Sequence, residues 1–79
     1  MKANKVQKVQ QMETWLIGRD IQFKSLQNGH IQIFDPRTQE LKYQLWVTAE
    51  KMKEHNPGGE ERVWIGLAAI QNKLRREYE

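Results

Sequence analysis

The middle of the chain, residues 21–48, alternates between apolar and polar positions with a period of two, which is typical of half-buried β-strands. The alternation starts at Ile21, resumes after Asn28-Gly29 and resumes again after residues 35–38. Asn-Gly is a strong hairpin signal because both residues tolerate a positive φ angle. We therefore expect three strands in an antiparallel meander.

The parity of the apolar positions predicts the length of each turn. A two-residue loop at 28–29 would place the apolar side chains of the first strand on the opposite face from those of the second. A three-residue loop at 27–29, with Gly29 left-handed in a bulge, pairs Leu26 with His30 and keeps the apolar positions together. The same argument predicts an odd number of residues in the second turn.

This register gives the sheet one apolar face and one polar face. The predicted core face consists of Ile21, Phe23, Ile31, Ile33, Leu41, Tyr43, Leu45 and Val47. The opposite face consists of Gln22, Lys24, Leu26, His30, Gln32, Phe34, Lys42, Gln44 and Trp46. The second face is polar and cationic but carries two large aromatic side chains, which makes it the candidate working surface.

Helical patterns flank the meander on both sides. Residues 1–18 have apolar positions at helical spacing and end at Gly18, a common helix stop. Thr48 is placed to cap a short helix over residues 49–55. After the Pro- and Gly-containing break at 56–59, a last helix is expected over residues 60–77, with Gly66 in its middle marking close packing. The predicted fold is an α+β domain of order α-β-β-β-(short α)-α, with the helices on one face of a three-stranded sheet.

Size and composition narrow the class of protein. A chain of 79 residues makes a single domain, residues 1–79, with a small apolar core. It has no cysteine, which favours a cytoplasmic, intracellular location without disulfides. We find no signal peptide and no apolar run of membrane-spanning length, so no membrane partner is expected. The net charge of +3 is compatible with nucleic acid or an acidic protein surface.

The sequence contains no recognisable catalytic set. The two histidines, His30 and His55, are not at metal-ligand spacing, and Gly58-Gly59 lacks the pattern of a phosphate loop. Ser25 is the only serine and has no evident base partner. We therefore predict a protein that is not an enzyme and that needs no metal or other cofactor.

Short motifs in the first half of the chain resemble small phage-type proteins of uncharacterised function. Those proteins have a leading helix, a first strand of the form G-I-x-F and a turn of the form N-G-x-H. Here Gly18 and Phe23 are displaced by intervening residues, and His30 follows Gly29 directly. The resemblance implies a phage or mobile-element protein that acts on host machinery, for example as an inhibitor of a CRISPR effector.

Two further families resemble the chain in the order of their elements. Double-stranded RNA-binding domains grip phosphates with a lysine-rich start to the last helix, where this chain has Glu60 and Glu61, whose charge repels phosphate. HicA-type toxins carry a Gly-Ser-His turn with a catalytic histidine. The Asn28-Gly29-His30 turn is similar but lacks the serine, and the resemblance implies ribonuclease activity through His30.

Three interpretations of the polar face are open. The first is an interface for a protein or nucleoprotein partner, because exposed aromatics with neighbouring cations are favoured at interfaces. The second is a single-strand nucleic-acid site, with Phe34 and Trp46 as stacking platforms. In the third, the short helix or a second copy of the chain covers the face, as in a homodimer. The candidate partner-binding residues are Lys24, Leu26, His30, Gln32, Phe34, Lys42, Gln44 and Trp46.

Overall fold

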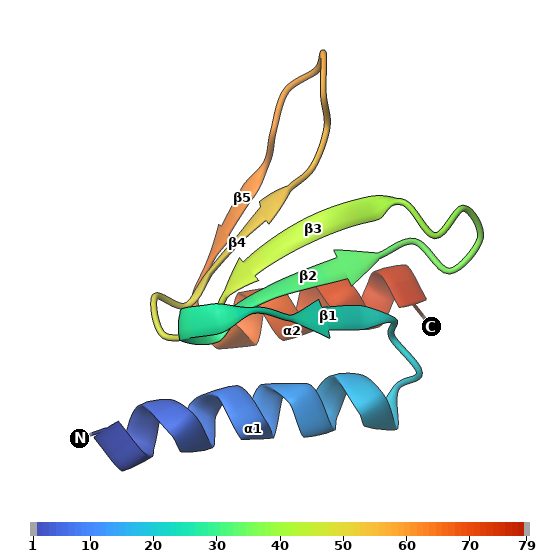
Figure 1. The fold of residues 1–79 in the computed structure, drawn as a ribbon. Helices are drawn as coiled ribbons and strands as arrows, with labels where there is room; N and C mark the ends of the chain where they lie inside the picture. Colours follow the sequence, from blue (N-terminus) through green and yellow to red (C-terminus); the bar gives the residue numbers. More distant parts are fainter. Residues whose placement is uncertain (1, 79) are drawn as a thin grey trace.

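Two α-helices pack on one face of a five-stranded antiparallel sheet (Figure 1). The computed structural model describes the backbone of residues 2–78 and the side chains of residues 5–78. The elements in chain order are α1 (Lys2–Gly18), β1 (Phe23–Ser25), the 3-10 turn η1 (Gln27–Gly29), β2 (His30–Phe34), β3 (Leu41–Trp46), β4 (Lys51–Glu54), β5 (Val63–Ile65) and α2 (Leu67–Tyr78). Each strand pairs with the next along the chain, so the whole sheet is a meander. The predicted α+β class is confirmed.

The predicted short helix over residues 49–55 is wrong, since this segment forms a turn and strand β4. Glu50 has a φ angle of +52°, which interrupts a right-handed helix at its start. Met52 is the one fully buried side chain of the segment, and it pairs with Leu45 of β3. A helix with a single apolar side chain has little to bury, whereas an added strand buries Met52 and satisfies the backbone of β3.

The predicted helix over residues 60–77 begins only at Leu67, and β5 precedes it. Gly66 has a φ angle of +94°, so it separates the strand from the helix. Its amide donates a hydrogen bond to the Glu50 carbonyl, 2.7 Å away. Gly66 does not mark close packing, because a Cβ added there would meet nothing within 4 Å. Val-Trp-Ile before a glycine is typical of a strand. The sequence-based prediction gave more weight to the helical spacing of the apolar residues in 63–74.

The first hairpin turn has the predicted geometry. The loop is the three-residue η1, the Leu26 amide donates to the His30 carbonyl at 2.7 Å, and Gly29 is left-handed with φ +76°. Strand β1 consequently pairs Phe23 with Ile33 and Ser25 with Ile31. The apolar positions of the two strands therefore share one face.

The second turn differs from the prediction. Phe34 pairs with Leu41, so the loop contains an even number of residues, 35–40. A bulge in β3 then shifts the register, and Ile33 pairs with Tyr43. The bulge corrects the parity for the rest of the strand but exchanges the faces of Leu41 and Lys42. Leu41, predicted in the core, shares the face of Phe34, and Lys42, predicted on the polar face, turns toward α2.

The core lies between the sheet and the two helices. Six of the predicted core-face residues are buried, and Phe23 is partly buried on its edge strand. The remaining buried residues come from both helices and β4, and the full set is Met12, Leu16, Ile21, Ile31, Ile33, Tyr43, Leu45, Val47, Met52, Ile70 and Leu74. No polar or charged residue among those described is buried. Both helices thus cover the same face, as the sequence predicts.

Helix α1 packs closely on the meander at Gly29. A Cβ at this position would lie 3.3 Å from a Val9 methyl carbon and 3.4 Å from the Thr48 methyl carbon. The left-handed backbone and the close contact both favour glycine.

We expect Gly29→Ala to lower the free energy of unfolding by about 1–2 kcal/mol, because alanine in left-handed backbone is strained. Gly58→Ala is the matched control, since Gly58 also has a positive φ angle, +80°, but has nothing within 4 Å of an added Cβ. Urea denaturation of both variants measures the difference. A smaller loss for Gly29→Ala than for Gly58→Ala would contradict the close packing of α1 on the turn.

Candidate functional site

The face of the sheet away from the helices is a continuous surface across all five strands, and we call it the open face. Residues that pair across neighbouring strands share a face, so the register defines its members. They are Gln22, Lys24, Leu26, His30, Gln32, Phe34, Leu41, Gln44, Trp46, Lys51, Lys53, Val63 and Ile65.

Two cross-strand rows run through the middle of the open face. In one row His30 pairs with Trp46, Trp46 with Lys51, and Lys51 with Ile65. In the other, Lys24 pairs with Gln32, Gln32 with Gln44, Gln44 with Lys53, and Lys53 with Val63. Each row therefore ends in an aliphatic side chain on β5 and has a lysine beside it on β4.

His30 and Trp46 form a stacked pair in the first row, across β2 and β3. Their ring centroids are 4.8 Å apart and their planes differ by 5°. This distance matches the spacing of neighbouring strands, so the two rings stand side by side on the sheet. The Nε2 atom of His30 is 2.9 Å from Oε1 of Gln44, which holds the imidazole in place. One face of the Trp46 ring is therefore covered by His30.

Exposed aliphatic side chains lie along both margins of the open face. Leu26 is 38% exposed, Val63 45% and Ile65 67%. The other large hydrophobic side chains that are exposed in the described part of the chain, Val6 and Ile17, belong to α1. An apolar patch with polar neighbours is the composition expected of a protein-binding surface.

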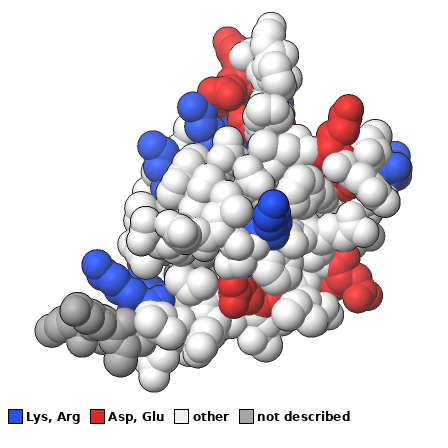
Figure 2. All heavy atoms as spheres, in the orientation of Figure 1, with Lys and Arg blue, Asp and Glu red and all other residues white. Residues whose placement is uncertain are grey.

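The charge of the open face is positive. Lys24 and Lys51 are exposed, while Lys53 forms an ion pair with Glu61 at 2.9 Å. The Glu61 carboxylate that pairs with Lys53 lies at the β5 margin of this face, and it offsets the charge of that lysine alone. Figure 2 shows basic side chains along the β4–β5 hairpin, acidic ones near its tip, and a broad uncharged area between the charged groups. This surface therefore favours an anionic partner.

Seven of the eight predicted partner-binding residues lie together on the open face, and Lys42 is the exception. The seven are Lys24, Leu26, His30, Gln32, Phe34, Gln44 and Trp46. Sequence reasoning missed Lys51, Lys53, Val63 and Ile65, because their segments were assigned to helices. The alternation of Lys51-Met52-Lys53 and the run of β-branched and aromatic residues in Val63-Trp64-Ile65 were the signals that could have found them.

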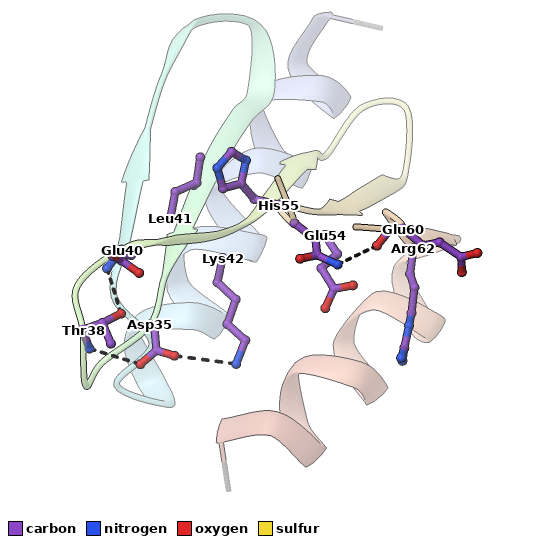
Figure 3. Close-up of a pocket in the computed structure, with 10 residues that line it drawn as sticks. Asp35, Thr38, Glu40, Leu41, Lys42, Glu54, His55, Glu60 and Arg62 are labelled. Atoms are coloured by element: carbon purple, nitrogen blue, oxygen red, sulfur yellow. Dashed lines mark hydrogen bonds and ion pairs between the residues drawn. The ribbon is translucent and has the colours of Figure 1, made fainter. Parts of the chain in front are cut away.

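Lys42 instead joins a polar network that fastens α2 to the sheet. Its ammonium lies 2.7 Å from Oε1 of Glu77 and 3.8 Å from the Asp35 carboxylate. The Tyr43 hydroxyl donates to Glu77 at 2.9 Å, and the Tyr78 hydroxyl donates to the Phe34 carbonyl at 3.2 Å. In Figure 3 the Leu41 and Lys42 side chains point in opposite directions, as the bulge requires.

The network shifts the pKa values of its members. Contact with the Lys42 ammonium lowers the pKa of Glu77 and outweighs partial burial, and the Tyr43 hydroxyl lowers it further. Burial is the main cause that raises the pKa of Tyr43, and burial likewise raises the pKa of Tyr78 to about 12. These groups make the polar contacts between α2 and the sheet, so we assign the network a structural role.

A shallow polar pocket lies between the loop at 35–40 and the hairpin at 54–62 (Figure 3). The Asp35 carboxylate accepts hydrogen bonds from the Arg37 and Thr38 amides, and the Asn56 amide donates to the Glu60 carbonyl. These bonds stabilise the two loops. Among residues 2–78, no group of three or more His, Asp or Glu side chains is placed to hold a metal ion.

No known protein indicates the function of this chain by similarity. The chain matches no protein-family model, no curated protein and no solved structure. Neither α1 nor α2 combines the length and hydropathy that a membrane-crossing helix needs, and this holds for the described residues. The open face is the surface on which the aromatic, cationic and exposed aliphatic side chains gather.

The Glu77 network predicts a pH dependence of stability. Because the pKa of Glu77 is lowered in the folded protein, its contribution is present above its ordinary value of 4.5 and is lost as the pH falls through the lower folded value. We expect Glu77→Gln to be less stable than wild type at neutral pH and to lose less stability on acidification. Urea denaturation from neutral pH to about pH 2.5 measures this, and Glu40→Gln, in an exposed loop, is the control. Parallel pH profiles for wild type and Glu77→Gln would contradict the role of the network.

Proposed function

We propose that this chain is a non-enzymatic binding protein that docks an acidic protein surface on its open face. The observation that carries the proposal is the combination of a stacked aromatic pair, exposed lysines and exposed aliphatic side chains on one sheet face. The Trp46 ring supplies a large anchor, Lys51 pairs with it across β3 and β4, and Lys24 lies on the edge strand β1 of the same face. Aromatic anchors inside a polar margin dominate the affinity of protein interfaces.

The exposed aliphatic margin favours a protein over a nucleic acid. Leu26, Val63 and Ile65 project from the face that also carries the lysines. Contact with a phosphate backbone does not bury these side chains in an apolar environment. Contact with a protein surface does, and each Å² of apolar area removed from water contributes about 25 cal/mol to binding. The partner that fits is therefore one with carboxylates placed among apolar side chains.

Binding of a single nucleic-acid strand is the second candidate, supported by the exposed lysines Lys24 and Lys51 on the same face as Phe34. Lys24 and Lys51 would contact phosphates, and Phe34 would stack on a base. The His30–Trp46 stack weighs against this use, because rings 4.8 Å apart leave no room for a base between them. The anionic-protein interpretation makes use of more of the surface.

The proposal of a non-enzymatic role rests on the surroundings of His30. Its Nε2 atom is engaged by the Gln44 amide, and its ring is stacked on Trp46. Neither neighbour can act as the acid or base partner that a nuclease needs. The ribonuclease role implied by the HicA-like turn is therefore the less favoured interpretation.

The partner's identity stays a prediction that rests on the phage-type resemblance. That resemblance implies a component of host nucleic-acid or defence machinery, such as a CRISPR effector. The chemistry of the open face adds one constraint, namely that the contacted surface is acidic.

The test compares binding by open-face variants with binding by a variant of equal charge. Wild-type protein, Trp46→Ala, Lys24→Glu/Lys51→Glu and the control Lys5→Glu/Arg75→Glu are immobilised and exposed to host lysate. Lys5 and Arg75 are exposed on the two helices, so the control changes the net charge equally. We expect the control to retain a partner that both open-face variants lose. With the recovered partner, Trp46→Ala should weaken binding by about 2 kcal/mol or more, as for an interface hot spot.

Two results would contradict the proposal. One is equal recovery of every bound protein by all four chains. The other is tight binding of a labelled single-stranded oligonucleotide that depends on Lys24 and Lys51 and falls steeply with salt, which would favour the nucleic-acid interpretation.

A further inference from the structure

The two edges of the sheet differ in how they are protected. Strand β1 has Lys24 at its centre, and an edge lysine discourages pairing with another strand. Strand β5 reads Val-Trp-Ile and carries no charge, and its Val63 and Ile65 side chains are exposed. An uncharged edge of β-branched and aromatic residues is a template for one more strand.

The backbone groups of β5 point in known directions. The Glu54 amide donates to the Arg62 carbonyl at 2.8 Å, and the Gly66 amide donates to the Glu50 carbonyl at 2.7 Å. In an antiparallel pair, hydrogen-bonded positions alternate with positions whose groups point away. Arg62, Trp64 and Gly66 therefore face β4, while the N–H and C=O groups of Val63 and Ile65 face outward from the sheet.

We propose that β5 pairs antiparallel with β5 of a second copy of this chain, so that the two sheets become one continuous sheet. A two-fold axis at Trp64 sets Val63 opposite Ile65 of the second copy. The outward N–H and C=O groups of these residues then satisfy one another in a single register. Such a contact is isologous and closed, so it ends at a dimer.

Side chains and charges are compatible with this register. Val63 and Ile65 meet their counterparts on the open face and cover aliphatic surface that is exposed in the single chain. Lys51 and Lys53 lie one strand further from the axis, so the lysines of the two copies are kept apart. Continuing the register brings Glu60 and Glu61 toward the first turn of α2 in the second copy. That turn has no acidic residue of its own, and carboxylates stabilise a helix N-terminus.

The size of the contact sets its strength. A three-residue edge strand buries less than the roughly 1,600 Å² of a standard interface, so we expect a reversible dimer with a dissociation constant in the micromolar range. The dimer places two open faces side by side. A partner that presents two acidic sites would then bind more tightly through both copies.

Sedimentation velocity over a concentration series, from about 1 µM to about 1 mM, tests the dimer. Wild-type protein should shift from monomer to dimer, and Val63→Pro should remain monomeric, because proline removes an outward N–H without breaking a bond to β4. Ser25→Pro is the matched control at the β1 edge. The bonds of Leu26 with His30 and of Phe34 with Gln22 show that the Ser25 amide also points outward.

Ile65→Lys provides a second variant that keeps the proposal falsifiable if Val63→Pro does not fold. Ile65 is 67% exposed, so a lysine there is compatible with the monomer fold and gives β5 the protection that Lys24 gives β1. In the dimer, the amides of residues 63 and 65 should exchange hydrogen more slowly as the concentration rises. Wild-type protein that stays monomeric throughout the series would overturn the proposal. So would a dimer that Trp46→Ala abolishes and the β5 variants leave intact, because that result assigns the contact to the open face.

Discussion

The cross-strand register set at the first turn is the constraint on which the rest of the structure depends. With Gly29 left-handed, Leu26 meets His30, and the apolar residues of β1 and β2 fall on one face. A slip of one residue would turn Ile31 and Ile33 to solvent and place His30 and Gln32 against the helices. Both helices depend on this choice, because Leu16 of α1 and Ile70 of α2 bury their side chains against that face.

The bulge in β3 connects the strand register with the packing of α2 on the sheet. The loop at 35–40 has the wrong parity for the apolar pattern, and the extra residue restores it from Tyr43 onward. The same bulge turns Lys42 toward the helix, where it pairs with Glu77. A local irregularity of the strand therefore supplies both a correct core and a polar contact for the C-terminal helix.

The sequence predicts the first half of this fold well because alternation and a glycine turn act locally. The three-residue turn, the faces of β1 and β2, and the placement of Trp46 and Phe34 opposite the core all follow from parity. Strands β4 and β5 are missed because each is short and gains its stability from a neighbour. Met52 is buried only once β3 is present, and Val63–Ile65 fits helical spacing as well as it fits a strand. The misplacement of Lys42 has the same origin, since a bulge is set by pairing rather than by residue type.

Separation of the sheet into a covered and an open face is the central claim, and the neighbours Leu45 and Trp46 test it most directly. Leu45 is fully buried beneath the helices, whereas Trp46 is half-buried and stacked on His30. We predict that Leu45→Ala lowers the free energy of unfolding by about 3–5 kcal/mol. Trp46→Ala, although it removes the larger side chain, should cost only about 1–2 kcal/mol. Urea denaturation of dilute protein measures both values. A loss for Trp46→Ala equal to or greater than that for Leu45→Ala would mean that the open face is covered within the single chain.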